Sequence, residues 1–141
     1  MNEKNNNDLE KRVRNIEKDV RYLKNDMRTI RDYYILGDTD KTIDIISKGI
    51  SSSSRKAKIL LLCFDKARTQ KQICDELNLL KGDVSVLIKE LEESRLIDPP
   101  EKIGRLKYIR TSYLCEKNLL KKAIEKSLDK KIAKEIIDEL G

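Results

Sequence analysis

Four cations lie close together in the last third of the chain. Lys102, Arg105, Lys107 and Arg110 fall in a stretch that has no acidic residue from Lys102 to Cys115. Ammonium and guanidinium groups at this density suit phosphate, and phosphate contacts supply much of the affinity of nucleic-acid-binding proteins. The competing interpretation is a solvated hairpin on an unrelated small α+β domain. The net charge of the chain, +6 from 31 Lys and Arg against 25 Asp and Glu, favours a polyanionic partner.

The sequence offers little for enzyme chemistry. It contains no histidine, no glycine-rich phosphate loop and no Gly-x-Ser-x-Gly motif, and its acidic residues are scattered. Cys63, Cys74 and Cys115 lie far apart, without the paired spacing of a disulfide framework or a zinc site. Cys63 and Cys74 fall on apolar stripes and suit small core positions. We therefore predict a protein that is not an enzyme and has no metal or cofactor; a thiol redox sensor is the alternative.

Two short amphipathic helices precede the cations. Residues 69–72, Thr-Gln-Lys-Gln, form a capping-box pattern that begins the first helix. Residues 78–81 interrupt the apolar periodicity, which resumes in a second helix over about 81–94. The apolar residues of the two helices are Ile73 and Leu77, then Val84, Leu87, Ile88 and Leu91. A helix-turn-helix places such a second helix in the major groove, whose width admits one helix.

A basic β-ribbon is expected directly after these helices, over about 99–111. Pro99-Pro100 ends helical structure, Gly104 supplies a tight turn, and 105–111 alternates as a strand does. The predicted fold is therefore mainly α with a small β-wing, a winged helix-turn-helix. An amino-terminal coiled-coil helix and carboxyl-terminal helices complete it.

Residues 55–115 resemble the winged-helix domain of prokaryotic transcription regulators of the MarR and ArsR kind. The resemblance rests on TQKQICDELNL at 69–79, DVSVLIKELEE at 83–93 and Arg95-Leu96-Ile97. It implies DNA-binding regulation, usually by a dimer, and leaves the operator and any effector open. Family members often carry Ser or Thr where Leu80 stands, and Arg or another long polar residue near Val86.

The candidate DNA-binding residues come from the start of the first helix, the solvent face of the second, and the wing. They are Thr69, Gln70, Lys71, Lys81, Ser85, Lys89, Lys102, Arg105, Lys107 and Arg110. No Arg, Asn or Gln on the second helix's solvent face offers a bidentate base contact. We therefore expect weak direct base readout and affinity mainly from phosphates. For Lys81 and Lys89, ordinary solvated lysine is the alternative.

The amino-terminal segment carries an apolar seam. Its members alternate at spacings of four and three: Leu9, Val13, Ile16, Val20, Leu23, Met27, Ile30 and Tyr34. This period of 3.5 predicts a coiled coil, and valine at a with leucine or isoleucine at d favours two parallel strands. The interhelical charge pairs expected in that register are opposite in sign: Arg12 with Glu17, Asp19 with Lys24, and Asp26 with Arg31. The alternative is one amphipathic helix that packs on its own domain.

The remaining segments are expected to be helical. Residues 39–50 form a short helix, Ser51–Ser54 a linker whose last member caps the next helix, and 55–66 the first helix of the winged domain. Residues 116–141 are helical with a break at 127–129; they either dimerise or pack on their own chain. The expected divisions are 1–36, 37–54, 55–115 and 116–141. No apolar run reaches the length of a membrane span and no signal-peptide pattern is present, which predicts a cytoplasmic protein.

These observations predict a homodimeric transcription regulator that binds double-stranded DNA. A winged helix used for protein assembly and a sequence-tolerant nucleoid protein are the alternatives. The sequence does not identify a small-molecule effector.

Overall fold

The computed structural model describes residues 9–14 and 38–141. The chain divides into two compact units, Met1–Gly37 and Asp38–Gly141. In the first unit, residues 9–14 are helical, and Leu9 and Val13, one turn apart, are 57% and 53% exposed. The other predicted seam positions, from Ile16 to Tyr34, lie outside the described residues, as does at least one partner of each predicted charge pair.

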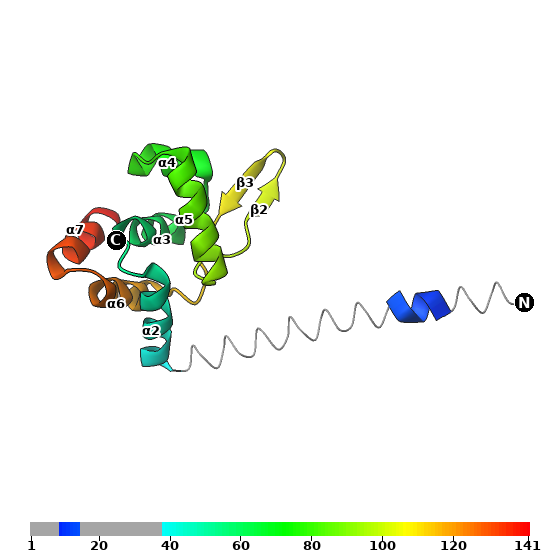
Figure 1. The fold of residues 1–141 in the computed structure, drawn as a ribbon, viewed down its shortest axis with the longest axis horizontal. Helices are drawn as coiled ribbons and strands as arrows, with labels where there is room; N and C mark the ends of the chain where they lie inside the picture. Colours follow the sequence, from blue (N-terminus) through cyan, green and yellow to red (C-terminus); the bar gives the residue numbers. More distant parts are fainter. Residues whose placement is uncertain (1–8, 15–37) are drawn as a thin grey trace, which may run out of the picture. The chain divides into compact units, whose positions relative to one another are not determined.

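The second unit has the winged helix-turn-helix fold that the sequence predicts. Its elements in order are α2 (Thr39–Ile50), α3 (Ser54–Asp65), β1 (Arg68–Thr69), α4 (Gln70–Leu77), α5 (Lys81–Glu93), β2 (Glu101–Ile103), β3 (Leu106–Ile109), α6 (Lys117–Ser127) and α7 (Lys130–Leu140) (Figure 1). The helix predicted over about 81–94 is α5, which ends at Glu93, one residue earlier than expected. The strands of the wing occupy the middle of the predicted ribbon.

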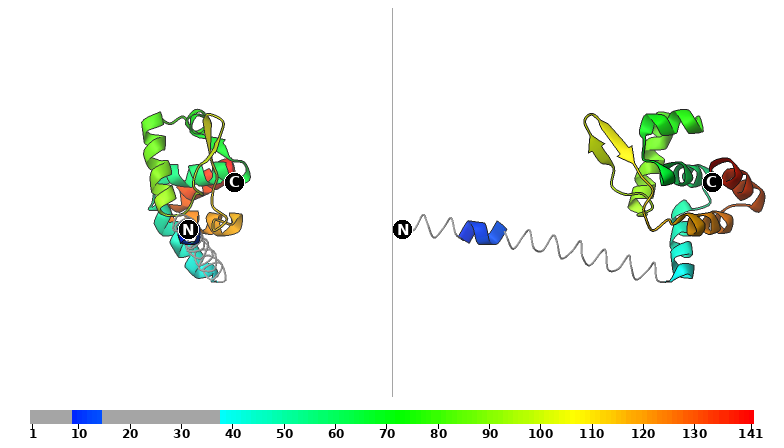
Figure 2. Two further views of the ribbon diagram at one scale, coloured as in Figure 1. Left: turned by 90° about the vertical axis from the view of Figure 1, so that its right-hand side faces the viewer. Right: turned by 180° about the vertical axis from the view of Figure 1, so that it is seen from behind.

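The small sheet joins the helix-turn-helix to the wing. β3 is central and pairs antiparallel with both β1 and β2. Lys102 lies opposite Lys107, and Ile103 lies opposite Leu106. Gly104, with φ of 64°, makes the tight turn at the tip. Figure 2 shows this hairpin projecting from the helical body next to α5.

One hydrophobic core holds the helices, and α3 lies at its centre. Ile59, Leu60 and Cys63 of α3 are fully buried. They belong to the same buried cluster as Ile73 of α4 and Val84 of α5. α4 and α5 therefore pack their apolar stripes inward, as the periodicity predicts, and leave their polar faces to solvent.

The carboxyl-terminal helices pack on their own domain. α6 lies along α2, and α7 packs on α3. The inner faces of both are buried, through Leu120 and Ile124 on α6 and Ala133 and Ile136 on α7. Lys126 forms an ion pair with Asp44, whose pKa is lowered by the hydrogen bond from that ammonium. The sequence left open whether residues 116–141 dimerise or pack on their own chain. The inner faces of α6 and α7 pack on their own chain.

The serine-rich linker is a tight turn between two helices. Ser51 and Ser52 have φ of 51° and 59°, and the Ser51 amide donates to the Ser47 carbonyl at 3.1 Å. Ser53 caps α3 by accepting from the Lys56 amide at 3.3 Å. The expectation that Ser54 is the cap is therefore wrong by one residue: Ser54 is already helical. Within the described residues, no helix is long and apolar enough to cross a membrane.

Candidate nucleic-acid interface

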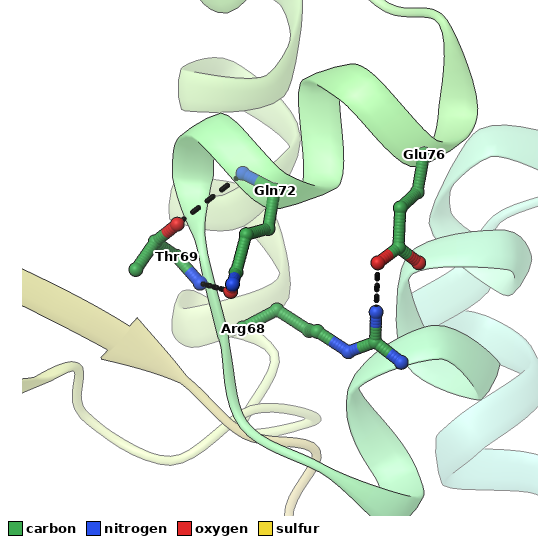
Figure 3. Close-up of polar contacts among 4 residues, drawn as sticks. All are labelled: Arg68, Thr69, Gln72 and Glu76. Atoms are coloured by element: carbon green, nitrogen blue, oxygen red, sulfur yellow. Dashed lines mark hydrogen bonds and ion pairs between the residues drawn. The ribbon is translucent and has the colours of Figure 1, made fainter.

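α4 begins with the capping box that its sequence predicts. The Thr69 hydroxyl accepts from the Gln72 amide at 3.2 Å, and the Gln72 side chain accepts from the Thr69 amide at 2.9 Å (Figure 3). Two amides that the first helical turn would leave unpaired are thereby satisfied. Thr69 is largely buried, so its hydroxyl serves the start of the helix.

A second interaction fixes the strand before α4. Arg68 of β1 forms an ion pair with Glu76, near the end of α4 (Figure 3). Both side chains are only partly exposed, and Arg68 Nε is buried without a hydrogen-bond partner. The charge of Arg68 is thus used within the fold. Arg68 is therefore not counted among the candidate DNA-binding residues described next.

Gln70 connects the two helices of the helix-turn-helix. Its side-chain amide donates to the Lys81 carbonyl at 3.0 Å and to the Ser85 hydroxyl at 2.9 Å. Both acceptors lie in the first turns of α5. Two candidate DNA-binding side chains, Gln70 and Ser85, therefore bind each other and set the position of α4 against the start of α5.

α5 buries one face and exposes the other. Val84, Ile88 and Leu91 are buried, whereas Lys81, Ser85 and Lys89 are exposed. The exposed face also carries two large apolar side chains: Leu80 is 74% and Val86 is 56% exposed. Leu80 is the N-cap residue and makes no side-chain capping bond. The candidate lysines of α5 are thus accessible to a partner.

Two ion pairs link α5 to α3. Lys56, only 8% exposed, contacts Glu90 at 2.8 Å. Arg55 lies 3.8 Å from Asp83 in an exposed pair. The second pair places a cation beside the one acidic residue in the first turn of α5. Neither pair was anticipated from the sequence, because the partners are far apart along the chain.

The wing presents its cations to solvent. Lys102, Arg105, Lys107 and Arg110 are exposed, and within the described residues none of them forms an ion pair. Close to Arg110 lies Asp98, whose pKa is raised by burial although Arg110 acts to lower it. At the wing tip Ile103 and Leu106 are 59% and 52% exposed, a feature that the charge pattern did not reveal.

A cavity of about 230 Å³ separates α5 from the wing. Its lining residues are Gln70, Ser85, Ile88, Lys89, Glu92, Pro100, Lys107 and Ile109. Four of the ten candidate residues therefore meet in one concave surface, drawn from α4, α5 and β3. Lys71, Lys81, Lys102, Arg105 and Arg110 lie outside this lining, on exposed positions of the same elements or of the wing around them.

Two of the three cysteines are poorly suited to thiol chemistry. All three are free, and burial raises the pKa of Cys63 and of Cys115 to about 12. The thiolate is the reactive form, so burial disfavours reaction of these two thiols at neutral pH. Across the ranges that the structure describes, no three potential metal-binding side chains gather at one point.

No family model and no curated protein matches the sequence. Among solved structures, two of HlyU from Vibrio cholerae N16961, one of them in its reduced form, are similar to this chain. Both are 14% identical; they cover 61% and 60% of this chain and 88% and 83% of their own, with TM-scores of 0.49 and 0.48. A structure of disulfide-formed AbfR is 17% identical, with a TM-score of 0.43, over 89% of this chain and 92% of that one.

Proposed function

We propose that this protein is a DNA-binding transcription regulator that acts as a homodimer. α5 enters the major groove of duplex DNA, and the β2–β3 wing contacts the phosphates beside it or the minor groove. The observation that carries the proposal is the exposed wing, whose four cations have no ion-pair partner in residues 9–14 and 38–141, next to the exposed face of α5.

The charge distribution supports a polyanionic partner. Residues 55–115 hold 13 basic and 9 acidic side chains, a difference of +4, so most of the net charge of +6 belongs to the winged domain. Lys102 and Lys107 lie directly opposite each other in the sheet. Like charges in this position repel, and a phosphate between them relieves the repulsion.

The heptad seam supports two copies per complex. Leu9 and Val13, the described members of the seam, are more than half exposed in the single chain, as residues that await a partner helix would be. A dimer also matches the usual pairing of two recognition helices with two half-sites about one helical turn of DNA apart. The inner faces of α6 and α7 are already covered by their own domain.

The test compares two variants of equal charge. In the first, Lys102, Arg105, Lys107 and Arg110 are replaced together by Ala. In the matched control, four exposed lysines of α6 and α7 are replaced instead: Lys122, Lys130, Lys131 and Lys134. Each variant loses four positive charges from +6 and so has a net charge of +2. Binding of each to duplex DNA is titrated at several salt concentrations.

The wing variant should bind more weakly, and its salt dependence should be shallower by about 0.9 in log–log slope for each phosphate that the wing no longer neutralises. The control should keep most of the wild-type slope. Equal slopes for the wild type and the wing variant would remove the wing from the interface. A preference of about a thousandfold for the protein's own promoter over scrambled duplex indicates a regulator. Steep salt dependence without preference indicates a nucleoid protein, and no binding indicates an assembly module.

A further inference from the structure

The exposed face at the start of α5 includes two large apolar side chains where a base-reading helix usually carries polar ones. Leu80 and Val86 are 74% and 56% exposed and contribute little to the core. A helical side chain covers the turn before its own Cα, so Val86 lies over the turn that contains Gly82. Lys81 and Lys89 are exposed as well, and at 3.6 residues per turn both lie on the same side of Gly82 and Val86. We call the exposed apolar positions Leu80, Gly82 and Val86 the α5 patch; two cations lie beside it.

Gly82 has no explanation within the fold. It is helical with no positive φ, and a Cβ built on it meets no atom within 4 Å. Glycine inside a helix lowers stability relative to alanine, so a position that tolerates alanine ordinarily disfavours glycine. What glycine offers at such a place is close approach of the backbone by another molecule.

The major groove contains one apolar group that the α5 patch fits. Thymine alone among the four bases presents a methyl group there, and aliphatic side chains contact it. The rest of the groove edge consists of hydrogen-bond donors and acceptors, for which Leu80 and Val86 offer no partner. The two exposed lysines beside the patch suit the phosphates along one edge of the groove, whereas an apolar protein partner would leave them unpaired.

We propose that Leu80 and Val86 read thymine methyl groups, and that Gly82 lets the α5 backbone approach the bases closely enough for this contact. The inference rests on the proposed function, since it requires α5 in the major groove. It gives the protein a preference for thymine at defined positions without a bidentate hydrogen bond to any base.

The test removes the methyl group alone. The full chain is titrated with a duplex of dA and dT in mixed order, and with the same duplex carrying dU at every dT. A second pair of duplexes, of dG and dC, is compared with and without 5-methyl groups on dC. The same four titrations are made with the Leu80→Ser, Val86→Ser double variant. A matched control, Ile132→Ser, removes an apolar side chain that is 44% exposed on α7.

We expect dU to weaken wild-type binding about fourfold for each methyl group that the α5 patch no longer covers, which is the transfer free energy of one buried CH₂. Methylated dC should strengthen binding in the same way. The double variant should bind the two members of each pair equally, and Ile132→Ser should keep the wild-type ratios. Circular dichroism melting confirms that each variant is folded.

Equal binding of the dT and dU duplexes by the wild type would overturn the inference while the proposed function stands. Discrimination that persists in the double variant would also overturn it, because another surface would then sense the methyl group. No binding to any duplex would remove the proposed function itself and would leave the α5 patch to a protein partner.

Gly82→Ala gives an independent readout. The variant should melt a few degrees higher than the wild type, as expected for alanine in a helix, and should bind the dA·dT duplex more weakly. Unchanged DNA affinity would overturn the close approach assigned to Gly82.

Discussion

Replacing Gly49 by Ala tests the packing that positions α5. Gly49 lies in the last turn of α2, and a Cβ added there falls 2.4 Å from Leu96 Cδ1 and 2.9 Å from Leu96 Cγ. Leu96, which follows α5, is fully buried, so its side chain has no solvent into which to move. Overpacking of this kind costs about 1–3 kcal/mol. The better helix propensity of alanine returns about 0.5–1 kcal/mol.

The expected net effect is therefore a destabilisation of up to about 2.5 kcal/mol. It is measured as the free energy of unfolding in urea, and as a fall in the thermal midpoint of about 4–8 °C per kcal/mol. Gly82→Ala is the matched control, since it places the same methyl group on a helix in open space and should stabilise the protein. Leu96→Ala should cost less in the Gly49→Ala background than in the wild type, because the two side chains compete for one volume.

A Gly49→Ala variant at least as stable as the wild type would refute the close contact between α2 and Leu96. The same conclusion would follow if the two glycine variants shifted stability in the same direction by the same amount.

Three further predictions concern the core and its edges. In the native protein at pH 8, Cys74 should be the first cysteine to react with a thiol reagent. The pKa values of Cys63 and Cys115 are about 12, which leaves roughly one in 10⁴ of these thiols ionised at that pH. Equal reaction rates for the three cysteines would contradict this. Thr69→Ala should lower the free energy of unfolding by about 1 kcal/mol through loss of the cap, a loss that Thr69→Ser should avoid. The pKa of Asp98 is raised from 3.8 by burial, so its ionised form opposes folding above the folded-state pKa and this cost vanishes below 3.8. Asp98→Asn should thus be more stable than the wild type at neutral pH, with a difference that shrinks in acid; a constant difference in denaturation midpoints would refute it.

The helix-turn-helix was predictable because its signals are local. The capping box at Thr69 needs two residues three apart, and the apolar stripe of α5 repeats within three turns. The tip of the wing was equally clear, since Gly104 has the positive φ that a tight turn requires. Each of these features depends on residues that are neighbours in sequence.

Contacts between distant segments could not be predicted in this way. β1 has two residues, Arg68 and Thr69, and exists only because β3 lies beside it. The ion pair between Lys56 and Glu90 joins side chains on two helices, and a lysine in a helix carries no mark that it will be buried. Such features follow from the tertiary fold, which single residues do not encode.

The sequence located the exposed cations of the candidate site but not the hydrogen bonds among its residues. The charge pattern located the wing cations, and the structure places them on the surface. The pattern gave no sign that Gln70 and Ser85 hydrogen-bond to each other, because their partnership depends on the angle between α4 and α5. The contribution of each residue to DNA binding stays a prediction, and so does the coiled coil beyond residue 14.

The wing is closed at its base by a short ladder of backbone hydrogen bonds. The Asp98 amide donates to the Arg110 carbonyl at 3.0 Å, and the Ser112 amide donates to the Leu96 carbonyl at 2.9 Å. The Thr111 hydroxyl then donates to the Leu60 carbonyl of α3 at 2.6 Å. The chain therefore leaves and re-enters the domain at adjacent points, and residues 102–107 extend beyond the part of β3 that pairs with β1.

The tip of a hairpin that is anchored in this manner can be replaced. Its length and sequence can change at little thermodynamic expense, since loop-closure entropy grows slowly with length and the anchoring bonds stay in place. Grafts of longer, shorter or differently charged ribbons in place of residues 102–107 should thus leave the remaining domain folded. A lineage that carries this scaffold can diversify the ribbon independently of the helices that support it.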